Sequence, residues 1–153
     1  MNPELLKYAQ ENLDKMPPEV QQKVGELIAE ARKLTTRELA HTDFMAFVNY
    51  VWPNFIHGEH HVKMARAFER VARGEVKRLI INMPPRHTKS EFASYLLPAW
   101  FLGMYPGKKI IQTSHTAELA VGFGRKVRNL VDSDRYKDIF PNVNLQADSK
   151  AAG

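Results

Sequence analysis

Residues 79–90 of this chain read LIINMPPRHTKS. The β-branched run 79–81 predicts a short strand, and the apolar spacing after Ser90 predicts a helix directly behind the loop. A strand, a tight loop and a helix that begins at Lys-Ser are the layout of a phosphate-binding loop, in which backbone N–H groups and the helix dipole face an anion. In that layout Lys89 reaches the outer phosphates and the Ser90 hydroxyl binds Mg²⁺.

The loop departs from the usual motif at its glycine positions. Met83 and Thr88 stand where the pattern Gly-x-x-x-x-Gly-Lys-Ser/Thr has glycine. A β-branched residue resists a positive φ, so Thr88 would store about 1–3 kcal/mol of strain if the loop requires one. Replacing Thr88 with Gly would then maintain or improve nucleotide binding. Three alternatives stay open. Lys89 and Ser90 only cap a helix, the Thr88 hydroxyl is itself a ligand contact, or the loop follows a path that suits a β-branched residue.

A family resemblance favours phosphate binding. The segment INMPPRHTKSE, residues 81–91, resembles the Walker A segment of phage large terminase subunits, the ATPases that pump DNA into capsids. Residues 51–85 and 108–141 resemble the lead-in to that segment and the strand and helix that follow it. The resemblance implies an ATPase that uses ATP and Mg²⁺. The residues it places around the nucleotide are Pro84, Pro85, Arg86, His87, Thr88, Lys89 and Ser90.

Roles and partners follow from the same resemblance. Arg86 would sense or stabilise the γ-phosphate, the alternative being an arginine paired with a nearby carboxylate. Residues 52–61 would lie near the adenine base. The implied partners are double-stranded DNA, the portal and a small terminase subunit, and the motor would form a homo-oligomeric ring. The implied location is the host cytoplasm, with transient docking at the procapsid portal, and a nuclease domain would cleave the DNA.

The order of elements predicts an α/β fold. Strand 77–82, helix 89–102, strand 109–113 and a helix capped by Thr116 form a βαβα series, which implies a parallel sheet. We therefore expect the opening half of a P-loop, RecA-like ATPase domain over residues 44–153, after a helical lead-in over residues 1–43. No apolar strand ends in paired acidic residues, so the Walker B motif is expected outside this chain. The resemblance implies that a coupling motif and a nuclease domain also lie outside it. Such a truncated chain would bind nucleotide without hydrolysing it.

Further helices are predicted from apolar spacing and caps. They comprise a first helix capped by Asn2, an amphipathic helix over 20–34, a helix over 44–51 capped by Asp43, a helix over 59–73 ended by Gly74, and a short one over 133–140. Pro98 should kink the helix behind the loop. The apolar face of helix 20–34 has two explanations, packing within its own domain or docking another subunit. The first is the usual one for a one-faced helix.

The charge distribution suits polyanionic partners. Residues 1–43 hold six Lys/Arg and eight Asp/Glu, whereas residues 44–153 hold sixteen and nine. The basic part includes six candidate contacts to DNA phosphates: Thr113, Ser114, His115, Arg125, Lys126 and Arg128. The alternative is that the hydroxyls cap a helix and the basic side chains form an ordinary solvated face. The sequence leaves both possibilities open.

Several classes of site and protein are disfavoured. The chain has no cysteine, which excludes disulfides and thiolate metal sites. No apolar run approaches the roughly 20 residues of a membrane span, and no signal peptide is visible. His57 and His61 lie four apart, but Gly58 interrupts them, so packing is favoured over metal binding. The alternatives to a terminase are another translocating P-loop ATPase, such as a helicase, and a non-catalytic remnant or binding protein.

Overall fold

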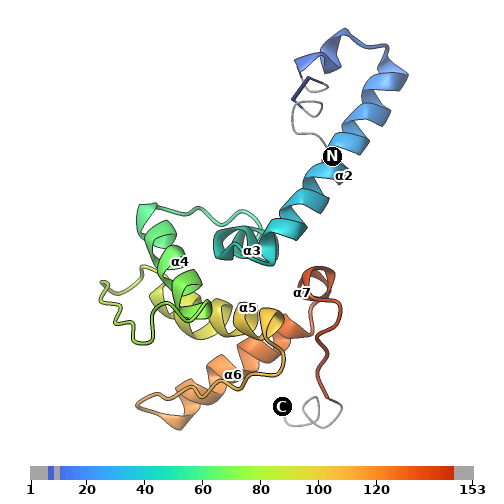
Figure 1. The fold of residues 1–153 in the computed structure, drawn as a ribbon. Coiled ribbons are helices and arrows are strands. Elements are labelled where there is room, and N and C mark those ends of the chain that lie inside the picture. Colours follow the sequence, from blue (N-terminus) through green and yellow to red (C-terminus); the bar gives the residue numbers. More distant parts are fainter. Residues whose placement is uncertain (1–6, 9–10, 147–153) are drawn as a thin grey trace.

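The computed structural model describes residues 7–8 and 11–146, and this part of the chain folds as helices joined by extended or irregular segments (Figure 1). The elements are η1 (Leu13–Lys15), α2 (Pro18–Ala40), α3 (Phe44–Val51), α4 (Glu59–Ala72), η2 (Glu91–Leu96), α5 (Leu97–Met104), α6 (Ala117–Val131) and α7 (Asp134–Ile139). The predicted cap at Asn2 and the chain end at residues 151–153 lie outside the described residues.

Side-chain caps set the starts of three helices. Asp43 Oδ1 accepts from the N–H of Ala46 at 2.6 Å at the start of α3. Thr116 and Ser133 do the same for α6 and α7, each at 3.3 Å. Gly74, with φ +79°, follows the end of α4 in the left-handed conformation that glycine adopts without strain. These caps confirm the helices predicted over 44–51, 59–73 and 133–140.

An aromatic cluster forms the core. The fully buried ring of Phe44 meets the rings of Phe68, Phe92 and Trp100 edge to face, with centroids 5.4, 5.7 and 5.3 Å away. Such pairs stabilise a core beyond the area they bury. Trp100 Nε1 also donates to the carbonyl of Ala40 at 2.9 Å, which ties α5 to the end of α2. The core thus holds α3, α4, η2 and α5 together.

Helix α7 closes the other side of this core. The hydroxyl of the buried Tyr136 donates to the carbonyl of Ala99 at 2.8 Å. Tyr50 on α3 donates its hydroxyl to the carboxylate of Asp138. Burial and then this bond raise the pKa of Tyr50 to about 12. The bond to Tyr50 leads the influences that lower the pKa of Asp138, and Lys33 and Arg37 act in the same direction.

The helix behind the loop forms as predicted, with one irregular stretch. Helical backbone begins at Lys89 and continues through η2, a π-helical stretch, into α5. Pro98 has no N–H and cannot donate to the carbonyl of Ser94 in α-helical register, which explains a break in register just before it. Gln112 Nε2 donates to that carbonyl at 2.7 Å. A side chain from the segment after α5 therefore meets the polar group that the proline leaves.

The α/β prediction is wrong. Within residues 7–8 and 11–146 the structure contains no strand, so the opening half of a RecA-like parallel sheet is not formed. The predicted strands 77–82 and 109–113 have no regular secondary structure and run beside the helices without pairing. Ile80 is 86% exposed and Ile111 is 90% exposed. A β-branched run favours an extended chain, but a parallel ladder also requires neighbouring strands and cover on both faces.

Helix α2 extends away from the core (Figure 1). Ile28 and Ala31 on this helix are buried, whereas Val20, Leu27 and Leu34 remain 43%, 58% and 44% exposed. The predicted packing of this helix within its own domain therefore holds for only part of its apolar face. In the part of the chain that the structure describes, no helix is both long enough and apolar enough to span a membrane.

Candidate phosphate-binding loop

The loop before η2 contains two residues in the left-handed region. Arg86 has φ +66° and Thr88 has φ +54°. Neither is glycine, so each conformation costs on the order of 1–3 kcal/mol. The expected positive φ at Thr88 is confirmed, whereas the one at Arg86 is not foreseen from the motif. Strain of this kind persists only where surrounding contacts hold the backbone in place.

The loop presents backbone donors to an open hollow. No hydrogen bond among the described residues uses the backbone N–H of Arg86, His87 or Thr88. Residues 83–91 line a hollow of about 380 Å³. The helical backbone starts at Lys89, so the positive end of the helix dipole lies at the same place. Free N–H groups beside a helix start are the chemistry that binds phosphate.

His61 on α4 is hydrogen-bonded to the loop at Thr88. Its Nε2 lies 2.5 Å from Thr88 Oγ1, and its Nδ1 accepts from the N–H of Gly58 at 2.9 Å. Because Nδ1 is an acceptor, the ring proton is on Nε2 and His61 donates to Thr88. The Thr88 hydroxyl in turn donates to the carbonyl of His87 at 2.8 Å. The strained residue of the loop is thus bonded to a buried side chain.

His61 is fixed by aromatic packing. It is 6% exposed, and its ring lies 4.9 Å from the rings of both Phe55 and Phe92. Burial lowers the pKa of His61, and positive charge on His60, His57 and His87 lowers it further. The neutral ring required by the hydrogen bonds is therefore also the form that the surroundings favour.

His60, His87 and Trp52 lie around His61 and its ring partner Phe55. His60 lies 3.8 Å from His61 and 5.7 Å from His87, measured between ring centroids. Among the described residues, no cluster of three or more His, Asp or Glu side chains is arranged to hold a metal ion. Trp52 is 36% exposed and stacks on Phe55 at 4.7 Å. The implied place for adenine near residues 52–61 stays a prediction.

The remaining predicted loop residues face solvent to different degrees. Arg86 is exposed and makes no ion pair with any described residue, so the local carboxylate partner considered above is not seen. Lys89 is half-buried, and Ser90 is exposed. Pro85 contributes its carbonyl, which lies 2.9 Å from His87 Nδ1. Together with Pro84, these side chains surround one hollow.

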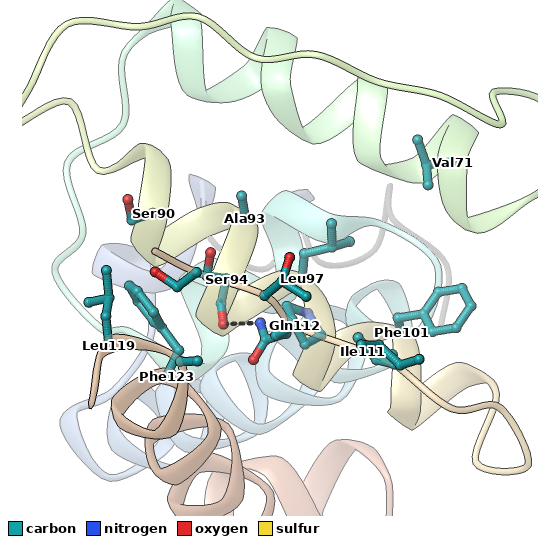
Figure 2. Close-up of a pocket in the computed structure, with 15 residues that line it drawn as sticks. Val71, Ser90, Ala93, Ser94, Leu97, Phe101, Ile111, Gln112, Leu119 and Phe123 are labelled. Carbon is teal, nitrogen blue, oxygen red and sulfur yellow. Dashed lines mark hydrogen bonds between the residues drawn. The ribbon is translucent and has the colours of Figure 1, made fainter. Parts of the chain in front are cut away.

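A second hollow (Figure 2) shares Ser90 with the first. It measures about 460 Å³ and lies between η2, α5, α6 and the extended segment 110–114. Figure 2 shows apolar side chains such as Leu97, Phe101 and Phe123 around it, with the Gln112–Ser94 bond within. Ser90, Thr113 and Ser114 all line it. The predicted Mg²⁺ ligand and two of the predicted DNA contacts therefore share this hollow.

The predicted basic contacts differ in availability. Lys126 is bound to Glu91 at 2.7 Å, and its Nζ lies over the rings of Tyr95 and Phe123 at 5.9 and 5.5 Å. Arg128 donates to Asn129 at 3.4 Å. Arg125 is exposed and lines a shallow hollow with His115 and Lys126. Arg125 is thus the more available cation of this group.

Two residues of the site are missed by sequence reasoning. His61 is considered only as part of a histidine cluster, and Gln112 only as part of a strand. A signal for His61 exists in hindsight, since a β-branched residue at a glycine position requires a side-chain anchor. Nothing local to residue 88 identifies which side chain supplies it.

Comparison with protein-family models, with curated proteins and with solved structures finds no match for this chain.

Proposed function

We propose that the loop over residues 84–90 binds the phosphates of Mg²⁺-ATP. We further propose that the chain is the ATP-binding part of a DNA-packaging motor of the large terminase type. The observation that carries the proposal is the loop itself. The free N–H groups of Arg86, His87 and Thr88 border a hollow at the start of the helix that follows. The proposal rests on this loop and on the segment resemblance.

The side chains around the hollow fit a polyphosphate. Arg86 and Lys89 supply positive charge beside the free N–H groups, and neither is neutralised by a carboxylate among the described residues. Charge-assisted hydrogen bonds from such groups to phosphate oxygens are about twice as strong as neutral ones. Lys89 would neutralise charge on the transferring phosphoryl group.

Ser90 is the residue that would bind Mg²⁺. Ser90 is an exposed residue in the first turn of the helical segment, as a ligand to a phosphate-bound cation must be. Ser90 would hold the ion, which would neutralise charge on the phosphates when bound. Glu91 is the acidic residue in the lining of the hollow, and it pairs with Lys126. The chain's own residues therefore support nucleotide binding better than hydrolysis.

The partners of the motor are part of the same proposal. Double-stranded DNA would meet Arg125 and the hydroxyl-bearing residues Thr113 and Ser114, which are exposed. The exposed apolar side chains of α2 provide a face for a small terminase subunit. Docking at a portal and assembly into a ring follow from the resemblance alone. A helicase-type ATPase would use the same loop, and its distinguishing residues would lie elsewhere.

Titration with a fluorescent ATP analogue, and competition by unlabelled Mg²⁺-ATP, test the proposal. We expect saturable binding by the original chain and at least a tenfold weaker Kd for Lys89→Ala, since loss of a charged hydrogen bond costs about 1.5–3 kcal/mol. Lys23→Ala, at an exposed lysine on α2, is the matched control and should bind normally. Equal binding by both variants, or no binding by the original chain, would refute the proposal.

A further inference from the structure

The contacts of Thr88 extend from the loop to the start of α4. The backbone N–H of Gly58 donates to His61 Nδ1 at 2.9 Å, and His61 Nε2 lies 2.5 Å from Thr88 Oγ1. The Thr88 hydroxyl donates to the carbonyl of His87 at 2.8 Å. Every donor and acceptor in this chain of bonds is matched when His61 is neutral with its proton on Nε2. Along the series from Gly58 to His87, each group donates its proton to the next.

The chain of bonds ends on a strained residue. Thr88 has φ +54°, a conformation that costs little for glycine and is disfavoured for a β-branched side chain. Without an external constraint, such a loop would relax away from this conformation. His61 can supply the constraint because it is 6% exposed and packs against the rings of Phe55 and Phe92. A rigid donor therefore faces the hydroxyl of the residue that most needs restraint.

We infer that His61 is a positioning residue for the phosphate-binding loop, which it holds in its binding conformation through the hydroxyl of Thr88. The inference rests on the proposed function, since it concerns the same loop. The threonine and the histidine act as a pair: Thr88 needs an anchor because it is not glycine, and His61 is that anchor. His61 itself touches no phosphate and acts only through Thr88.

The surroundings of His61 favour the required neutral ring. Burial lowers its pKa first, and the three titratable neighbours His60, His57 and His87 lower it further. A proton on Nδ1 would face the N–H of Gly58 and break that bond. The ring ¹⁵N shifts of His61 in the nucleotide-free protein give a direct readout. We expect the neutral tautomer protonated on Nε2 at pH 7, and the other tautomer or a charged ring would overturn the inference.

A double-mutant cycle tests the pairing. We expect His61→Ala to weaken the Kd for the fluorescent ATP analogue about threefold to tenfold, the usual effect of one lost hydrogen bond. Thr88→Gly alone should bind as well as the original chain or more tightly, because glycine adopts this φ without strain. In the Thr88→Gly background, His61→Ala should change the Kd by less than about twofold.

Other outcomes distinguish the possible failures. An equal loss in both backgrounds would mean that His61 only stabilises the fold, and this would overturn the inference. His61→Gln retains an N–H donor near Nε2 and should restore most of the binding, and failure to do so would count against the anchor. If the original chain binds nucleotide and Lys89→Ala abolishes it while the cycle shows no coupling, the proposed function stands and the inference falls. If nothing binds, the proposed function itself fails.

Discussion

Trp100→Phe should destabilise the protein well beyond the effect of a smaller ring. Trp100 is 1% exposed, and its Nε1 donates to the carbonyl of Ala40, a residue with no exposed surface. Phenylalanine keeps an aromatic ring against Phe44 but has no donor, so the carbonyl is left buried without a partner. Such a group costs about 1–3 kcal/mol. The void left by the smaller ring adds about 1 kcal/mol.

The expected loss is therefore about 2–4 kcal/mol in the free energy of unfolding. In a chain of this size each kcal/mol lowers Tm by about 2–4 °C, so Tm should fall by roughly 4–16 °C. Urea unfolding followed by far-UV circular dichroism measures the change without relying on tryptophan fluorescence. A loss of this size would support the aromatic core around Phe44.

The chain offers a matched control at its other tryptophan. Trp52 is 36% exposed and stacks on Phe55, and no described hydrogen bond uses its indole N–H. Trp52→Phe should change the free energy of unfolding by about 0.5 kcal/mol or less. If the two variants lose the same stability, Trp100 is not the buried tie between α5 and α2, and the packing described above is incorrect.

Two further predictions concern packing and charge. Gly103→Ala should cost about 1–3 kcal/mol, because its Cβ would overlap the ring of the buried Phe140. Gly25→Ala, with nothing within 4 Å, should instead stabilise α2 by up to about 1 kcal/mol, and thermal unfolding of both checks the contrast. The pKa of Tyr50 is raised from 10.0 to about 12 in the folded protein. The stability that its neutral hydroxyl contributes is therefore fully present below pH 10 and is lost as pH rises to 12. The stability difference between the original chain and Tyr50→Phe should shrink over that window, and a constant difference would contradict the Tyr50–Asp138 bond.

Much of the helical structure can be predicted from local sequence. Asp43, Thr116 and Ser133 have side chains that accept hydrogen bonds from the first turn of a helix, and each does so here. Gly74 ends α4 because it adopts φ +79° without strain. Pro98 predicts a kink and the structure has a π-helical stretch just before it, since the missing N–H breaks the regular register. These features depend on residues a few positions apart.

The sheet is where sequence reasoning fails. Residues 79–81 and 109–113 have the composition of strands, but a strand is defined by a partner. Composition cannot say whether a neighbour lies alongside, and in the described chain Ile80 and Ile111 face solvent instead. The order strand, helix, strand, helix therefore does not by itself establish a sheet.

The candidate site likewise combines a feature that local sequence predicts with a feature that depends on tertiary packing. The positive φ at Thr88 follows from its place in the motif, which is a local argument. The anchor does not, because His61 lies 27 residues away in sequence. The aromatic rings that fix His61 come from Phe55 and Phe92, on either side of that gap. They meet through mutual ring contacts between His61 on α4, Phe55 in the segment before α4, and Phe92 on η2.

Backbone amide NMR tests the central claim most directly. Mg²⁺-ATP titrated into ¹⁵N-labelled protein should shift the amides of residues 86–91 more than any others, because their N–H groups would face the phosphates. Lys89→Ala should greatly reduce these shifts, and Lys23→Ala should leave them unchanged. Absence of shifts, or shifts centred on Arg125 and Lys126 in α6, would contradict a phosphate-binding loop at this position.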